Sequence, residues 1–183
     1  IVRAEIATAL GRSKGKAARD ALIAAAGEPA ARVRRAIAGA LGSFRDAEAA
    51  ATLRGYLGAA EAKPRRRSRA AIVGDPGDVS YYVQANAAAS LGRTLDGSAF
   101  DALTAVLGRP AHNDVITAAA LTGLGALRDA RALPLLLEHT AWGVHQNSRR
   151  AAVAALGALA PHVDDTARTR IGERLQELLD DRW

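Results

Sequence analysis

The chain has 183 residues, no cysteine and a formal net charge of +6, with 49% hydrophobic but only 4% aromatic residues. Its apolar content is therefore mainly Ala and Leu, which favour helices, whereas β-sandwiches need β-branched and aromatic residues. The absence of cysteine excludes disulfides and thiolate chemistry within this chain. No apolar run reaches the length of about 18 residues that a membrane-spanning helix needs.

A Leu-Gly pair recurs along the chain, at residues 10–11, 41–42, 91–92, 124–125 and 156–157. The positions eight and four residues before each Leu are mostly Val, Ile or Ala, and the residue directly before it is Ala, Ser or Gly. Residues four apart share one helix face, so each segment predicts an amphipathic helix. We expect the Gly to end the helix in the left-handed conformation and the small residue to let neighbouring helices approach closely.

A second helix is expected after each Leu-Gly pair, with Asp46, Ser98 and Asp129 as candidate N-caps for three of them. One helix pair of about 32 residues cannot bury both its faces, so the pairs must stack. The pattern predicts a single all-α domain, a right-handed α-α superhelix of five helix pairs with one basic loop insertion. The expected repeats are about 1–27, 31–58, 80–108, 112–140 and 146–181.

The two ends of the chain differ in character. The first residue is Ile, the chain has no Met, and the opening residues have the pattern of a helix interior without a cap. We therefore expect an N-terminus truncated from a longer chain. The last helix, about 163–180, is expected to place Ile171, Leu175 and Leu178 or Leu179 on one side, and acidic residues elsewhere. Such a polar outer face is typical of a terminal repeat.

The regular spacing of the Leu-Gly pairs is broken once, by an insertion at 62–80 with the sequence AKPRRRSRAAIVGDPGDVS. Its candidate anion- or partner-binding residues are Lys63, Arg65, Arg66, Arg67 and Arg69. Arginine pairs bind carboxylates and phosphates, but a solvated loop explains the same charges. No aromatic residue lies in the run, which disfavours nucleic acid. A second basic cluster in the first inter-helix turn could share a face with the insertion: Arg12, Lys14, Lys16 and Arg19.

Four residues are candidates for a binding groove: Tyr81, Tyr82, Trp142 and His145. For the tyrosines, core packing is the simpler interpretation of at least one. Trp142 is either an exposed anchor for a partner or a plug in the repeat interface.

Other polar residues have structural interpretations. Asn113 and Asp114 precede a helix, and we interpret them as structural caps because no further His or acid has metal-ligand spacing to them. Arg3, Arg34 and Arg149 recur seven residues before the closing Leu. They predict a structural ladder in which each Arg pairs with an Asp or a backbone carbonyl of the next unit.

The V-R-x-x-A-x-x-A-L-G unit resembles HEAT repeats, in particular the short kind found in the bilin-lyase HEAT-like group. Three later segments also resemble the C-terminal region of bacterial M1-family zinc aminopeptidases. They are D-V-S-Y-Y-V-Q-A at 78–85, H-N-D-V-I at 112–116 and R-A-L-P-L-L-L-E at 131–138. The basic insertion departs from that family's pattern.

The aminopeptidase resemblance implies a cover that shapes peptide access to a catalytic domain elsewhere in the parent protein. The family's H-E-x-x-H and G-x-M-E-N motifs are absent here. We therefore expect no catalytic residue, metal or cofactor in this chain, with zinc in the parent. The chain itself is expected not to be an enzyme.

The expected partners are an upstream domain of the same chain or a protein or peptide ligand, with nucleic acid less favoured and no membrane, and the expected location is cytoplasmic. One alternative is a free-standing adaptor that binds protein, an anion or nucleic acid. Another, less favoured, is an enzyme on a HEAT scaffold, such as a base-excision glycosylase or a bilin lyase.

Overall fold

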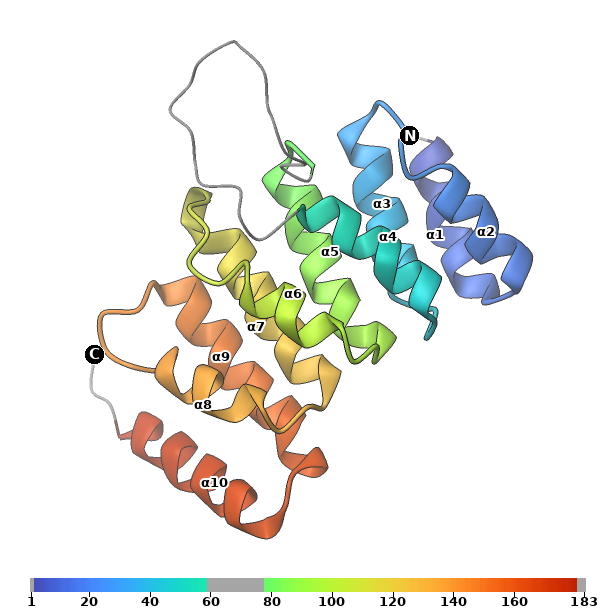
Figure 1. Ribbon diagram of the computed structural model, residues 1–183. Coiled ribbons are helices and arrows are strands. Elements are labelled where there is room, and N and C mark those ends of the chain that lie inside the picture. The colour runs from blue at the N-terminus through green and yellow to red at the C-terminus, as the bar shows by residue number, and fades with distance from the viewer. Residues whose placement is uncertain (1, 59–77, 181–183) are drawn as a thin grey trace.

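The computed structural model describes residues 2–58 and 78–180, which form helices and connecting turns without any strand (Figure 1). Two short 3-10 helices, His112–Asp114 and Ala160–His162, accompany ten α-helices in these ranges. The α-helices are α1 (Val2–Ser13), α2 (Lys16–Ala24), α3 (Ala31–Leu41), α4 (Ala47–Leu57), α5 (Tyr81–Thr94), α6 (Ala99–Thr104), α7 (Val115–Leu127), α8 (Ala132–Glu138), α9 (Gln146–Leu159) and α10 (Asp165–Leu179).

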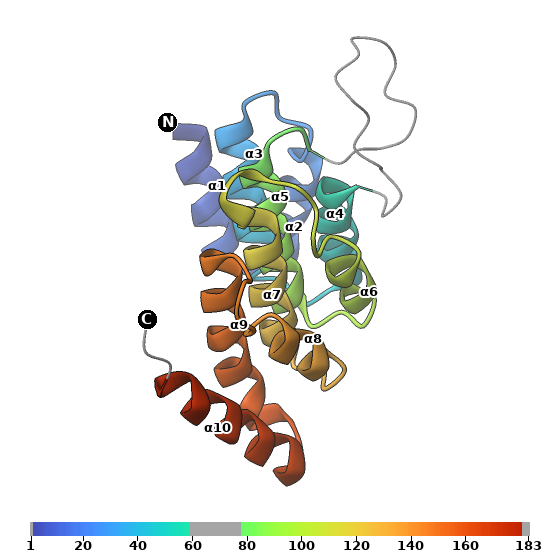
Figure 2. The ribbon, with the colours of Figure 1, turned by 90° about the vertical axis from the view of Figure 1, so that its left-hand side faces the viewer.

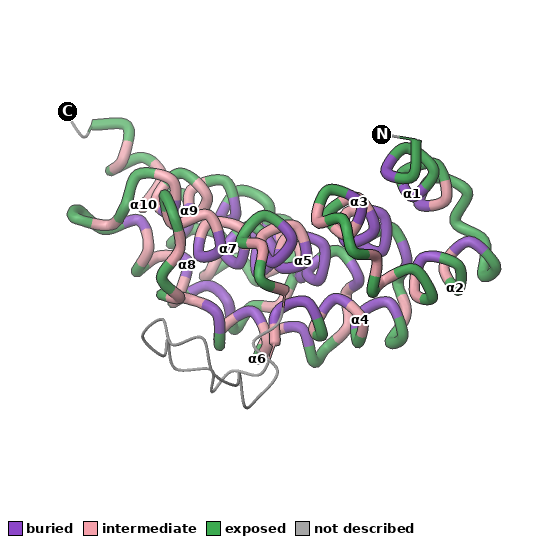
Figure 3. Tube along the Cα trace, turned by 90° about the horizontal axis from the view of Figure 1, so that it is seen from above, coloured by how far each residue is buried: buried purple, intermediate pink, exposed green. Residues whose placement is uncertain are grey.

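The helices form two layers, with α1, α3, α5, α7 and α9 in one and α2, α4, α6 and α8 in the other, while α10 lies across the end of the row (Figure 2, Figure 3). This arrangement confirms the predicted α-α solenoid. Seen from above, the row curves so that α1, α3, α5, α7 and α9 lie on its inner side (Figure 3). The core lies between the layers, where large aliphatic side chains are fully buried: Leu22, Ile37, Leu41, Leu53, Leu57, Leu91, Leu103, Ile116, Leu121, Leu124, Leu136 and Leu156.

The glycines of the Leu-Gly pairs do not end the helices in the left-handed conformation, so that prediction is wrong. Four of the five lie inside α1, α5, α7 and α9, and Gly42, which follows α3, has φ −64°. In these four repeats the helix continues beyond the pair, and in three of them it ends near a left-handed residue. The left-handed residues are then the non-glycines four positions after the Leu: Lys14, Leu95 and Arg128.

These glycines instead allow successive inner helices to touch. A Cβ built on Gly11 would lie 2.7 Å from the Cβ of Ala40, and one on Gly92 would lie 1.9 Å from the carbonyl oxygen of Gly123. A Cβ on Gly125 would lie 2.7 Å from the Cβ of Ala155. Each partner is the small residue directly before the Leu of the next repeat. The predicted close approach of neighbouring helices is therefore confirmed. Each contact pairs the small residue of one repeat with the glycine of the repeat before it.

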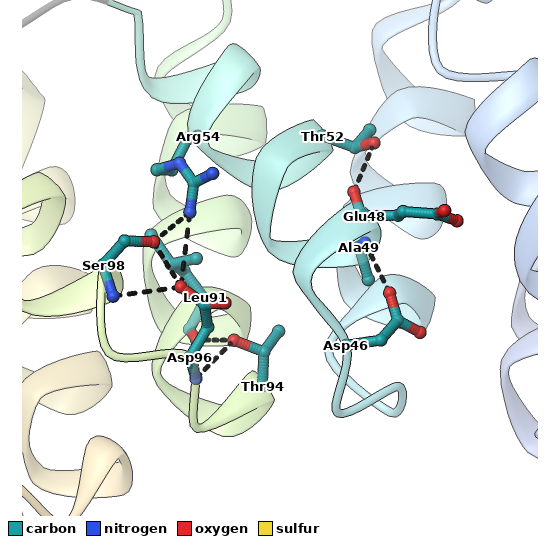
Figure 4. A network of polar contacts seen from close by, with 9 residues as sticks. All are labelled: Asp46, Glu48, Ala49, Thr52, Arg54, Leu91, Thr94, Asp96 and Ser98. Atoms are coloured by element: carbon teal, nitrogen blue, oxygen red, sulfur yellow. Dashed lines mark hydrogen bonds and ion pairs between the residues drawn. The ribbon is translucent and has the colours of Figure 1, made fainter.

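Of the three predicted N-caps, one caps its helix and two do not. Asp46 accepts a hydrogen bond from the amide of Ala49 at 2.8 Å, which confirms it as the cap of α4 (Figure 4). Ser98 makes no capping bond to α6. Asp129 precedes α8 by three residues, and its carboxylate accepts from the amide and guanidinium of Arg131 instead. Ser98 has helical backbone angles, and Asp129 lies two residues before Arg131, which takes the N-cap position of α8, so neither side chain is placed to cap.

Ser98 belongs to a polar network between two repeats (Figure 4). Its amide and hydroxyl donate to the Asp96 carboxylate, which also faces the Arg54 guanidinium at 3.5 Å. The hydrogen bonds from Ser98, aided by the Arg54 charge, hold the pKa of Asp96 below its usual value.

The last helix buries less than its pattern predicted. Ile171 is buried and Leu175 packs against the core, but Leu179 is 85% exposed. Asp164 caps α10 by accepting from the amide of Ala167 at 2.8 Å. The expected apolar stripe therefore stops about one turn before the end of α10.

We predict that Gly92→Ala lowers the free energy of unfolding by about 2 kcal/mol or more, because the added methyl group overlaps the backbone of α7. The matched control is Gly157→Ala in α9, where nothing lies within 4 Å of the new Cβ. That control should stabilise the chain by about 0.5 kcal/mol, since alanine favours helices. Urea unfolding followed by circular dichroism measures both, and equal effects would refute the contact.

The Asp96 network predicts acid sensitivity. Because the folded pKa of Asp96 is depressed, its stabilisation is complete above the unfolded value of about 3.9 and disappears as the pH falls through the folded value. Ser98→Ala removes the main cause of the depression. It should cost about 1 kcal/mol at neutral pH and much less at a pH near 2. Urea unfolding of both proteins at the two pH values tests this, and a pH-independent loss would contradict it.

Candidate functional site

The chain before and after residues 59–77 is held together at one point of the solenoid. The carbonyl of Tyr56 accepts a hydrogen bond from the amide of Asp78 at 2.9 Å. The basic candidates Lys63, Arg65, Arg66, Arg67 and Arg69 fall outside the described residues. They stay a prediction that the structure does not address.

Asp78 is the centre of this anchor. Its nearly buried carboxylate accepts two hydrogen bonds from the Arg34 guanidinium, which also donates to the carbonyls of Glu28 and Pro29 at 2.7 and 2.6 Å. The pair raises the pKa of Arg34. Tyr56 lies beside it, and burial, aided by the Asp78 charge, raises the pKa of its phenol to about 12.

The predicted arginine ladder is confirmed at Arg34, which pairs with an aspartate at the start of the next repeat. Arg3 pairs with Glu28, at the turn before the second repeat. Arg149 points the other way, because its Nε donates to the carbonyl of Thr140 in the preceding repeat at 2.9 Å.

The tyrosines after the insertion do not pack in the core. Tyr81 and Tyr82 are 48% and 58% exposed. The Arg35 guanidinium lies 5.8 Å from the centre of the Tyr82 ring, at cation–π distance. The core-packing expectation is wrong for both, because Val83, the next residue, takes the buried position.

A cleft of about 500 Å³ lies on the inner helices α1, α3 and α5, and we name it the inner cleft. Small residues form much of its wall, with Arg12, Arg32 and Arg35 against a single acid, Glu5. The lining residues are Ala4, Glu5, Thr8, Gly11, Arg12, Arg32, Arg35, Ala36, Gly39, Ala40, Ser43 and Asn86. This surface combines apolar area with excess positive charge, and Tyr82 stands beside Arg35.

A second and larger cleft, of about 930 Å³, follows the turns that lead from the inner to the outer helices. We name it the edge groove. It takes residues from all five repeats: Lys14, Gly42, Ser43, Phe44, Arg45, Asp46, Arg93, Leu95, Gly125, Ala126, Arg128, Ala158 and His162. Of the predicted second basic cluster, Lys14 lines this groove. Arg12 lines the inner cleft, and Arg19 pairs with acids.

Two further groove candidates lie in the turn between α8 and α9. Trp142 is 77% exposed, so it does not plug the repeat interface. His145 is the N-cap of α9, and its Nδ1 accepts from the amide of Asn147 at 3.2 Å. His145 therefore has a structural role where a groove role was expected.

The expected caps Asn113 and Asp114 form a turn of two left-handed residues, with φ 51° and 57°. Asp114 stands at the N-cap position of α7 but makes no capping bond. Its carboxylate accepts from the Ser148 hydroxyl at 2.7 Å, and the Asn113 carbonyl accepts from the Asn147 side chain at 2.9 Å. The turn thus joins two repeats, because its left-handed backbone points the carboxylate away from the helix.

Within residues 2–58 and 78–180, no group of three or more His, Asp or Glu side chains is placed to hold a metal ion. No helix in the same ranges is both long and apolar enough to cross a membrane.

Comparison with known proteins identifies the family that has this architecture. The pattern that describes HEAT repeats matches residues 1–73 and 77–157. The chain belongs to the HEAT-repeat family. Residues 148–181 of this HEAT-repeat chain are also similar to the PBS lyase HEAT-like repeat. No curated protein matches the sequence.

One similar solved structure is the complex of CpcE and CpcF of phycocyanin lyase from Nostoc sp. PCC7120. The sequences are 28% identical and the TM-score is 0.66. The similarity covers 99% of this chain but 65% of that chain, so this HEAT-repeat chain spans about two thirds of its relative's length.

These similarities contradict the prediction that the chain is not an enzyme. The structural relative belongs to phycocyanin lyase, which is an enzyme, and the last repeat is similar to the PBS lyase HEAT-like repeat. The prediction relied on the absence of the H-E-x-x-H and G-x-M-E-N motifs, and these motifs are informative only about aminopeptidases. The chain is a HEAT-repeat scaffold that is structurally like a bilin lyase subunit.

The Arg34–Asp78 anchor gives a stability prediction. Asp78→Asn should lower the free energy of unfolding by about 3 kcal/mol, since it leaves the guanidinium of Arg34 without its anionic partner in a largely buried place. Glu177→Gln, which breaks the exposed pair with Arg174, is the control and should change little. Urea denaturation measures both. A loss for Asp78→Asn no larger than that of the control would show that the pair does not anchor α5.

Proposed function

We propose that this chain is a subunit of a bilin-lyase-type enzyme and holds a linear tetrapyrrole pigment on its inner face while a partner protein presents the acceptor. The observation that carries the proposal is the 28% identity to a phycocyanin lyase chain over 99% of this sequence, with a TM-score of 0.66. The similarity of residues 148–181 to the PBS lyase repeat supports it independently. The protein partner is a second HEAT-repeat chain or the acceptor itself.

The inner cleft suits a pigment of this class. A bilin is a conjugated, largely apolar molecule with two carboxylate side chains. The walls of Ala36, Gly39 and Ala40 offer apolar surface, and Arg32 and Arg35 offer guanidinium groups for the carboxylates. Tyr82 supplies an exposed ring beside Arg35 on which a conjugated system can stack. The cleft volume is in the usual range for small-molecule sites.

The chemistry of the chain limits its role in such a reaction. It has no cysteine, so it cannot form a thioether with the pigment as an intermediate. The thiol that accepts the pigment therefore lies outside these 183 residues. This chain binds and orients the pigment, and holding two reactants in position is itself a large part of catalysis.

The finer alternative, a cover for an M1-family aminopeptidase, has less support. The residues that carry that resemblance have structural work in the solenoid: Asp78 pairs with Arg34, and Asp114 accepts from Ser148. Neither similarity described above is to a peptidase. The role as a free-standing anion-binding adaptor is tested together with the lyase role below.

The test begins with pigment binding. Biliverdin, added to the purified chain, should shift its visible absorption and gain circular dichroism in the visible range. Arg35→Glu combined with Tyr82→Ala should weaken binding by about tenfold or more, because a carboxylate contact and a stacking surface are lost. Arg170→Glu, an exposed charge change on α10, is the matched control and should bind as the parent does.

The second stage tests transfer. The loaded chain is mixed with apo-phycocyanin, and pigment that stays with the acceptor in a denaturing gel shows covalent attachment. Attachment that depends on the chain supports the lyase role. Binding without attachment, with and without a co-expressed second HEAT-repeat chain, would support the adaptor instead. No binding at all would refute the inner cleft as a pigment site.

A further inference from the structure

The edge groove carries one basic side chain from each of the five repeats: Lys14, Arg45, Arg93, Arg128 and His162. The groove holds a single acid, Asp46. Asp46 is already engaged, because it caps α4 and pairs with Arg19 at 3.2 Å. The groove therefore presents four positive charges, from Lys14, Arg45, Arg93 and Arg128, with the imidazole of His162 beside them and one engaged acid among them.

The acids near this edge bind other arginines. Glu48 pairs with Arg19, and Asp129 pairs with Arg131. Asp96 pairs with Arg54, across the α4–α6 side of the same edge. In the part of the chain that the structure describes, Lys14, Arg45 and Arg128 form no ion pair with any of these carboxylates.

A structural role at helix ends accounts for only part of this row. A cation near the C-terminus of a helix interacts favourably with its dipole, so one cation per inner helix stabilises the fold. However, Lys14 and Arg128 occupy left-handed backbone positions with φ 54° and 63°. Glycine takes this conformation without the cost of about 1 kcal/mol that other residues bear. The dipole effect is of similar size, so it leaves no net gain for a charged side chain here.

The spacing of the row suggests the shape of its ligand. Packed helices lie about 8–10 Å apart, so cations on successive repeats recur at about that interval. An extended polyproline II segment rises about 3.1 Å per residue, and every third side chain recurs after about 9 Å on the same side. An acidic residue at every third position of such a segment therefore meets one cation per repeat.

We propose that the edge groove binds an extended acidic segment of a partner protein, with its carboxylates in register with the repeats. The proposal does not rest on the pigment-binding role, because it uses a different surface. A protein segment is favoured over nucleic acid because Phe44, the one Phe, Tyr or Trp residue that lines the described groove, is buried, which leaves the imidazole of His162 as the one exposed ring on which a base can stack.

The test uses fluorescence anisotropy with the full chain and a labelled peptide of repeated Glu-Pro-Pro units. A peptide of the same composition with its glutamates contiguous tests the register, and an oligothymidylate tests the nucleic-acid alternative. Arg45→Glu with Arg128→Glu reverses two groove charges. Arg150→Glu with Arg170→Glu makes the same change of net charge at exposed positions outside the groove.

The Glu-Pro-Pro peptide should bind best, and binding should weaken as the salt concentration rises. The groove reversal should weaken it by at least about tenfold, and the control reversal by about twofold or less. Lys14→Gly with Arg128→Gly should also weaken binding while unfolding at the same or a higher urea concentration, which excludes misfolding as the cause.

Three results would overturn the proposal. One is no binding of the spaced peptide at low salt. The second is equal loss in the groove and control reversals, which would show a general charge effect. The third is oligothymidylate bound more tightly than the peptide, with a loss confined to the groove variants.

Discussion

Contact between the inner helices of successive repeats is the constraint on which the solenoid depends. At all four repeat boundaries a glycine faces a small residue of the next helix so closely that a methyl group would overlap it: Gly11 faces Ala40, Gly42 faces Ser90, Gly92 faces Gly123 and Gly125 faces Ala155. The outer helices bury larger side chains, such as Leu53 of α4 and Leu103 of α6. Because one layer is packed more tightly than the other, the row bends toward the inner side. The inner cleft and the edge groove both follow from this bend.

The repeat boundary between α4 and α5, where the insertion interrupts the chain, has a further anchor besides the contact of Gly42 with Ser90. Arg34, Asp78 and Tyr56 make a nearly buried polar anchor. Arg109 adds hydrogen bonds to the carbonyl of Leu57 at 2.6 Å and to the Gln84 side chain at 2.9 Å. Such a network stabilises only while all its members are present, since one missing partner leaves a charge desolvated.

The sequence pattern predicted the fold well because the Leu-Gly register and helical period report directly on burial. It failed at Gly92 and Gly125, where glycine can mean either a left-handed turn or a close contact. Only the position of the next helix decides between the two. It also failed at Asp114, and it did not identify His145 as the cap of α9, since capping depends on backbone angles that the residue type does not fix.

The candidate surfaces were harder to predict than the core. Arg32 and Arg35 lie three positions apart on the exposed face of α3. This polar face is the feature of the sequence that could have indicated the inner cleft. The edge groove joins residues from the turns of five repeats, at positions that differ from one turn to the next. Recognising it requires knowing that the helices run past their Leu-Gly pairs, which places Lys14 and Arg128 at the turn.

The closure of the chain at Tyr56 and Asp78 has a consequence for how this protein can change. The two backbone groups are 2.9 Å apart, so the segment between them starts and ends at one place on the solenoid. Lengthening a loop whose ends are already joined costs only about 0.6 kcal/mol for each doubling of its length. Evolution, or a protein engineer, can therefore exchange whole passages of sequence at this point while the helical stack on either side keeps its register.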